Sequence, residues 1–234
     1  MKTNTHLCRR RHAAFTLIEL LVVIAIISLL AALVIPIVGA ANANKQRSLA
    51  QTQLKALELA IDGYKTKLGF YPPDNPNDPL VNQLYFELLG TTNNGIGTIP
   101  TLWVTMDGSA QIGTTTTPYK INDLFGVVGF ANTSTRSHSD DSGAAAVTFI
   151  NNLTPNQIGL YDKAVPDVKL LVCSVPWPAE KGNLLTNAVA DLNPWRYNSS
   201  HPTNNTGSYD LWVDLIIRGR TNRICNWNTQ PIKL

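Results

Sequence analysis

The hydrophobic pattern of the chain is continuous near its start and periodic after about residue 42. The segment from Phe15 to Ala41 has 27 residues, and Glu19 is the only one among them with an ionisable side chain. An α-helix of this length would measure about 40 Å, which exceeds the ~30 Å hydrocarbon thickness of a bilayer. The pattern therefore predicts an apolar helix that spans a membrane and contains one glutamate.

Apolar residues then recur at spacings of four and three, which is the pattern of a helix with one buried face. The residues at these positions are Ala50, Leu54, Leu57, Ile61, Tyr64 and Leu68. We expect the helix to continue to about Leu68, with Gly69 as its C-cap. Its first half is apolar on every side, and its second half is amphipathic.

The remaining sequence predicts short elements and an α+β fold in which the long N-terminal helix packs on a small antiparallel sheet. Short helices are expected at 79–89 and at about 144–151. The residue types and turn signals predict strands at 168–173, 195–198, 209–217 and about 223–227. The second and third of these flank a polar turn, which indicates an antiparallel hairpin.

The basic residues are concentrated at the start of the chain. Of 19 Lys and Arg residues, four lie before Phe15: Lys2, Arg9, Arg10 and Arg11. The product that starts at Phe15 would have 15 basic and 16 acidic residues, a net charge of −1. Basic residues flanking a membrane span stay cytoplasmic, so the following body is expected on the other side. No basic stripe remains to bind nucleic acid, and no nucleic-acid partner is predicted.

The run Arg9-Arg10-Arg11-His12-Ala13-Ala14-Phe15-Thr16-Leu17-Ile18-Glu19 resembles the prepilin signal of type IV pilins and type II secretion pseudopilins. The resemblance implies that a prepilin peptidase/methyltransferase cleaves between Ala14 and Phe15 and N-methylates Phe15. It also implies an assembly role for Glu19. A similar role is implied for Pro36, because pilin helices commonly carry a proline at the position of Pro36. Ala14 departs from the family, which usually has glycine before the cleavage point.

The same resemblance implies a division of the chain into a leader at 1–14, a transmembrane and assembly half-helix at 15–41 and an amphipathic half-helix at 42–69. A periplasmic pilin-like globular domain would occupy 70–234, with a variable insert at about 91–165. The protein would cross the bacterial inner membrane once and then enter a periplasmic or surface filament.

Two later segments are similar to the major pseudopilin, of the general secretion pathway protein G type. One is the helix exit Gly69-Phe70-Tyr71-Pro72, and the other comprises Asn193-Pro194-Trp195 and Gly207-Ser208-Tyr209-Asp210. The implied function is a non-enzymatic filament subunit of a type II secretion system. Its partners would be copies of itself, other secretion or pilus assembly proteins and the inner membrane. The alternatives are a type IV pilin for adhesion, motility or DNA uptake, and a membrane-anchored binding protein.

The mature chain would retain one pair of cysteines, Cys173 and Cys225, which are either a disulfide or two buried thiols. Major pseudopilins hold calcium near their C-terminal hairpin, which makes Asp210 and Asp214 weak calcium candidates here. The second aspartate of the family pattern is absent, and Arg218 and Arg220 occupy its stretch. Calcium usually requires more than one carboxylate, so we expect Asp210 to accept turn hydrogen bonds instead, with no cofactor.

Two other interpretations of the sequence have less support. A secretory signal cleaved after Val38-Gly39-Ala40 would have an apolar core much longer than the usual ~7–15 residues. An uncleaved membrane anchor would give Glu19 no role. The adjacent Ser137, His138 and Asp140 are not grounds for catalysis, because a catalytic triad is defined by geometry.

Overall fold

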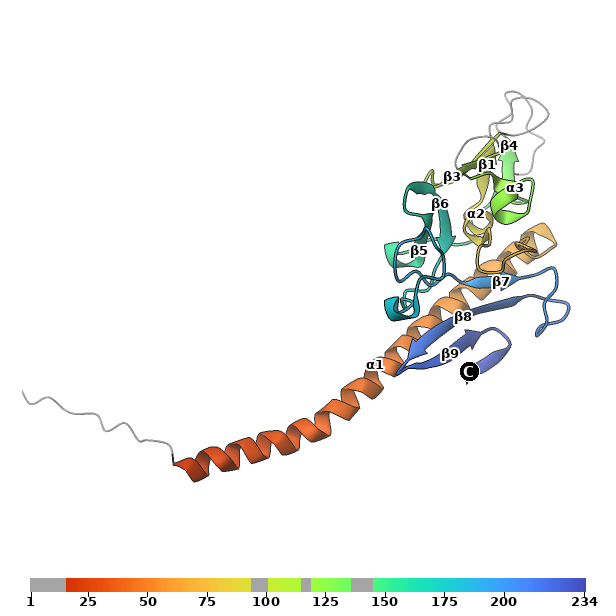
Figure 1. The fold of residues 1–234 in the computed structure, drawn as a ribbon. Coiled ribbons are helices and arrows are strands. Elements are labelled where there is room, and N and C mark those ends of the chain that lie inside the picture. Colours follow the sequence, from red (N-terminus) through yellow and green to blue (C-terminus); the bar gives the residue numbers. More distant parts are fainter. Residues whose placement is uncertain (1–15, 94–100, 115–118, 136–144) are drawn as a thin grey trace, which may run out of the picture. The chain divides into compact units, whose positions relative to one another are not determined.

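The structure is a computed structural model that describes residues 16–93, 101–114, 119–135 and 145–234, with the backbone alone at 33–38. The chain divides into two compact units, Met1–Asn44 and Lys45–Leu234. Helix α1, Leu17–Leu68, contributes to both (Figure 1). The predicted long helix is confirmed, and it begins two residues after Phe15.

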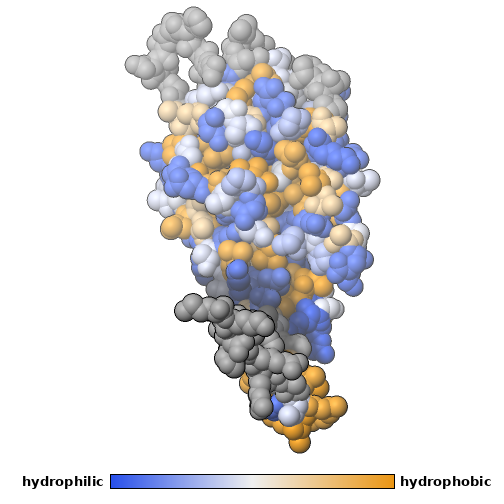
Figure 2. Space-filling view, turned by 90° about the vertical axis from the view of Figure 1, so that its left-hand side faces the viewer, coloured by the Kyte–Doolittle hydropathy of each residue, from blue (hydrophilic) through white to orange (hydrophobic). Residues whose placement is uncertain are grey.

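The described part of the first unit is a helix whose apolar side chains are exposed. Leu17, Ile18 and Leu20 are 81%, 69% and 58% exposed. Figure 2 shows a contiguous group of hydrophobic side chains on this part of α1. Within the residues described, no helical stretch has both the length and the apolar character needed to cross a membrane.

In the second unit, the predicted apolar face of α1 is buried against the globular body. Ala50, Leu54, Leu57, Ile61 and Tyr64 are between 0% and 4% exposed, as the spacing requires. The last member of the predicted series, Leu68, is only half-buried. The helix ends as expected, because Gly69 adopts φ +89° and its amide donates to the carbonyl of Lys65.

The C-terminal sheet is antiparallel and has the strand order β10-β9-β8-β7. Its strands are β7 (Arg196–Asn198), β8 (Asp210–Ile217), β9 (Arg220–Cys225) and β10 (Asn228–Lys233). The predicted hairpin between β7 and β8 and the strand near residue 223 are confirmed. The sequence did not predict β10, which is largely exposed and contains a proline, and so lacks an apolar alternation.

A second sheet has the order β3-β2-β1-β4 and lies within the segment predicted as a variable insert. It consists of β1 (Thr91–Asn93), β2 (Leu102–Thr105), β3 (Gln111–Gly113) and β4 (Thr133–Thr135). Strands β1 and β4 are parallel, so this sheet is mixed. A separate hairpin joins β5 (Ile158–Asp162) to β6 (Val165–Leu171), which contains most of the predicted strand 168–173. Besides α2, which is described below, the short helical segments of the described residues are α3 (Ile121–Phe125), η1 (Pro155–Gln157) and η2 (Ala179–Lys181).

The predicted helix at 79–89 is shorter in the structure. Helix α2 comprises only Leu84–Leu89. The side-chain amide of Asn82 donates to the carbonyl of Pro79 at 2.9 Å and to that of Trp195 at 2.7 Å. This carbonyl of Pro79 also accepts the amide of Tyr197, so the turn is tied to β7 and does not continue as a helix.

The predicted helix at about 144–151 is wrong for its described part, residues 145–151, which have no helical structure. Backbone groups there bond to other segments: Phe149 N donates to the carbonyl of Leu88, and Val147 N donates to Asn132 Oδ1. These tertiary bonds take the donors that a helix would have used internally.

A buried glutamate connects α1, α2 and the segment before β4. Glu87 is fully buried, and its Oε2 accepts the hydroxyl of Tyr64 at 2.8 Å. The amides of Ala131 and Asn132 donate to its two carboxylate oxygens at 2.8 and 2.9 Å. The carboxylate therefore joins three segments that are distant in the sequence.

Candidate assembly site

The start of α1 is organised by a reciprocal pair of hydrogen bonds between Thr16 and Glu19. The amide and hydroxyl of Thr16 donate to Glu19 Oε2 at 2.9 and 2.7 Å, and the amide of Glu19 donates to Thr16 Oγ1 at 3.2 Å. This is a capping box, which satisfies amides that the first helical turn leaves without partners. The Thr-x-x-Glu spacing is visible in the sequence, although our sequence analysis gave Thr16 no role.

The capping box turns the Glu19 carboxylate back toward the helix start. A negative charge is favourable there because the helix dipole is positive at its N-terminus. Thr16 follows Phe15 directly, so the capping box begins two residues after the predicted cleavage point at Ala14. Ala14 and Phe15 themselves lie outside the described residues.

The other residue predicted to act in assembly, Pro36, lies inside α1, and the helix continues through it. Proline removes one internal helix hydrogen bond, so this position lacks one backbone donor. The helix thus brings Glu19 and Pro36 onto one element, while their roles in assembly remain predictions.

Asp210, the first calcium candidate, is occupied by donors from its own loop. Its carboxylate accepts the amides of Thr203, Asn204 and Asn205 at 2.8–2.9 Å. Burial alone would raise the pKa of Asp210, but these hydrogen bonds outweigh it and leave the pKa below its ordinary value. The expectation that Asp210 accepts turn hydrogen bonds is confirmed.

Asp214, the second calcium candidate, forms an ion pair with Arg223. Arg223 Nε donates to Asp214 Oδ1 at 2.8 Å, and Nη2 donates to Oδ2 at 2.9 Å. Both carboxylate oxygens are engaged by the guanidinium, and the bond to Asp214 raises the pKa of Arg223. Asp210 and Asp214 therefore have separate partners, and the described residues contain no group of three or more potential metal ligands.

The two cysteines are free and buried in the structure, which does not contain the disulfide considered from the sequence. Cys173 follows β6, and its sulfur accepts the amide of Val175. Burial raises the pKa of the Cys173 thiol to about 11. Cys225 ends β9, where burial raises its pKa as well. Because burial raises the pKa of both thiols, each favours the neutral form, which is a poor nucleophile.

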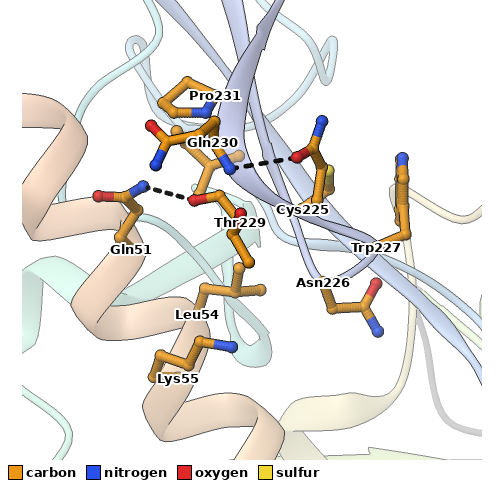
Figure 3. A pocket seen from close by; sticks show the side chains of 11 residues that line it. Gln51, Leu54, Lys55, Cys225, Asn226, Trp227, Thr229, Gln230 and Pro231 are labelled. Carbon is orange, nitrogen blue, oxygen red and sulfur yellow. Dashed lines mark hydrogen bonds between the residues drawn. The ribbon is translucent and has the colours of Figure 1, made fainter.

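A cavity of about 320 Å³ lies between α1 and the β9–β10 turn. Figure 3 shows Gln51, Leu54 and Lys55 on the helix side, with Asn226 and Trp227 on the turn. The ammonium group of Lys55 pairs with Glu58 at 2.6 Å. The lining has no nucleophile–base pair, and Ser137, His138 and Asp140 lie outside the described residues.

The N-terminal sequence that contains the capping box and the single charge of the apolar segment matches a known family. The match is to the prokaryotic N-terminal methylation motif, over residues 9–35. The predicted prepilin signal is thereby confirmed.

Two curated relatives are both named type II secretion system core protein G. The protein from Pseudomonas aeruginosa is 41% identical over 64 residues, which are 27% of this chain and 45% of the relative. The one from Aeromonas hydrophila is 38% identical over 76 residues, or 32% and 53% of the two chains. The chain thus spans about half the length of the curated relatives it matches. No solved structure matches it significantly. The predicted similarity to the major pseudopilin is confirmed.

Proposed function

We propose that this chain is the major-type pseudopilin of a type II secretion system, a structural filament subunit with a pilin-like fold. The proposal rests on Glu19, the one ionisable group of the apolar segment 15–41, which lies within a matched N-terminal methylation motif. The similarity to core protein G and the burial of the second half of α1 against an antiparallel sheet support it further.

The proposed subunit is anchored by residues 15–41 in the inner membrane, with its body in the periplasm. A prepilin peptidase cleaves it after Ala14 and methylates Phe15. It then joins a filament of its own kind together with other secretion components. In the filament, Glu19 of one subunit offsets the charge of the Phe15 amino group on a neighbour, since an unpaired charge in an apolar core costs several kcal/mol.

A type IV pilin is the nearest alternative. The disulfide considered from the sequence was the feature that favoured it, and the free Cys173 and Cys225 remove that support. The similarity to core protein G favours the pseudopilin.

Processing is tested by intact-mass analysis of the protein extracted from membranes. We expect a mature chain that begins with N-methyl-Phe15. A chain that begins at Ala41, or one that retains Met1, would refute the prepilin interpretation.

Assembly is tested by replacing Glu19 with glutamine. Glutamine is also found at this position of capping boxes, so Glu19→Gln retains the helix start but removes the charge. We expect normal processing and loss of filaments from Glu19→Gln and Glu19→Ala, with intermediate yield from Glu19→Asp. The matched control is Glu58→Ala, which removes a carboxylate from the amphipathic half of the same helix. Wild-type filament yield from Glu19→Gln, measured by electron microscopy of sheared filaments, would show that the charge is incidental.

A further inference from the structure

Five basic side chains gather at one end of the Lys45–Leu234 unit. Lys45 and Arg47 lie in the first turn that α1 contributes to this unit, Arg218 and Arg220 lie at the β8–β9 turn, and Lys233 ends β10. We call these five residues the basic patch. They come from three parts of the sequence, so their proximity depends on the fold.

Asn222 joins the three parts of the basic patch. Its Oδ1 accepts Nε and Nη2 of Arg47 at 3.2 and 3.1 Å, and its Nδ2 donates to the carbonyl of Arg220 at 2.9 Å. Lys233 is paired with Asn222 in the β9–β10 register. Asn222 is 2% exposed, so these contacts are fixed parts of the body.

The direction of β9 places the β8–β9 turn at the Lys45 end of the unit. Further along α1, Gln51 donates to the carbonyl of Thr229, beside the end of β9. The helix and β9 therefore run in the same direction. Because Arg220 precedes Asn222 in β9, it lies toward the N-terminal side of Arg47 along the helix. In Figure 1 the β8–β9 turn accordingly lies beside α1.

Four members of the patch, Lys45, Arg218, Arg220 and Lys233, are exposed and carry their charge at the surface. Among the described residues, ion pairs join Lys55 with Glu58 and Arg223 with Asp214, and neither pair includes Lys45, Arg218, Arg220 or Lys233. Arg218 has φ +52° and Gly219 has φ +74°, which is the two-residue type I′ geometry of a tight hairpin turn. This geometry holds the exposed Arg218 and Arg220 at the tip.

The concentration of positive charge contrasts with the balance of the unit. The sequence from Lys45 onward has 15 basic and 15 acidic residues, since four basic residues and Glu19 precede it. The five patch residues are therefore one third of the basic residues in a sequence whose formal charges balance.

We propose that the basic patch docks on the anionic phospholipid headgroups of the membrane that holds the apolar helix. The proposal rests on the membrane anchoring in the proposed function. Lys45 comes four positions after Ala41, so at most about 14 Å of chain joins this member of the patch to the end of the proposed membrane span. Charges interact appreciably within the ~8–10 Å Debye length, so the attraction is sensitive to lipid charge and to salt.

The test uses the full chain in nanodiscs of phosphatidylcholine, with or without about 30% phosphatidylglycerol, and measures hydrogen exchange of the amides from Arg218 to Asn222. We expect slower exchange in the anionic discs and reversal by salt. The variant R218Q/R220Q should weaken docking roughly 30-fold, because each basic residue near an anionic surface contributes about fivefold. The control K163Q/K181Q removes two exposed charges elsewhere and should retain the lipid effect.

Three results would overturn the proposal. Equal exchange in both kinds of disc would show that lipid charge is not recognised, and equal protection by inorganic phosphate in neutral discs would indicate a free anion. Protection in neutral discs that grows with the number of chains per disc would indicate a second copy as the partner. A chain that does not enter discs at all would overturn the membrane anchoring as well, so the two failures are distinguishable.

Discussion

The buried carboxylate of Glu87 should make the stability of the body depend on a single hydroxyl group, that of Tyr64. The change Tyr64→Phe removes the 2.8 Å hydrogen bond to Glu87 Oε2 and leaves the ring and its contacts in place. A hydrogen bond to a charged group contributes about 1.5–3 kcal/mol. Phe149 would still pack on the ring, whose centroid lies 5.2 Å from its own.

The loss should depend on pH in a defined direction. Burial raises the pKa of Glu87, while the amides of Ala131 and Asn132 and the Tyr64 hydroxyl lower it in part. A raised pKa in the folded state means that the folded protein holds this proton more tightly. The contribution of Glu87 to the free energy of unfolding is therefore greatest below the pKa of the unfolded state, about 4.5. It is lost as the pH rises through the pKa of the folded state.

Removal of the Tyr64 hydroxyl raises the folded pKa of Glu87 further, because one group that stabilises the carboxylate has gone. The cost of Tyr64→Phe should then be smaller at about pH 4.5 than at about pH 8, by roughly 1 kcal/mol, because a lower pH favours the neutral form of Glu87, which the hydroxyl stabilises less. At the higher pH, a loss of ~2 kcal/mol should lower the Tm by about 4–8 °C for a domain of this size.

All five tryptophans lie after residue 100, so their fluorescence reports on unfolding of the body of the full chain in detergent. Tyr161→Phe is the matched control. It removes the same atom from a half-buried tyrosine, and we expect a change within about 0.5 kcal/mol. Equal stability of Tyr64→Phe and the wild type at about pH 8, or an equal loss at both pH values, would refute a charged Glu87 held by this hydroxyl.

Three further predictions concern the body. Asp210→Asn leaves at least one loop amide without its acceptor, so it should destabilise the protein by about 1–3 kcal/mol. Proteolysis near residues 203–209 should become faster, and an unchanged cleavage rate would refute this prediction. With a thiol pKa of about 11, Cys173 should resist alkylation in the native protein and react after unfolding, and a mapped bond to Cys225 would contradict the free thiols. Gly159→Ala should lower the Tm, because the new Cβ would clash with Leu192 and lie 2.6 Å from the Val172 side chain. The control Gly182→Ala places its Cβ where no atom lies within 4 Å, so it measures only the cost of a positive φ.

The features of this protein that depend on local pattern could be predicted from the sequence. The apolar run, the four-and-three spacing to Tyr64 and the stop at Gly69 predict α1 because helix periodicity and glycine conformation act over a few residues. The prepilin signal is likewise a short contiguous motif. The capping box of Thr16 and Glu19 was available from the same spacing rule, although it was not used.

The tertiary structure decided what depends on partners distant in the sequence. Residues 79–83 have helix-forming neighbours, yet the bonds from Asn82 to Pro79 and Trp195 hold them as a turn. The same holds for the mixed sheet, which pairs β1 with β4 across more than 30 residues, and for the burial of Glu87. The basic patch has no sequence signature, because Arg47 and Arg220 are distant in the sequence and both bond to Asn222. Such contacts depend on how the elements pack, so they cannot be predicted from the local sequence pattern.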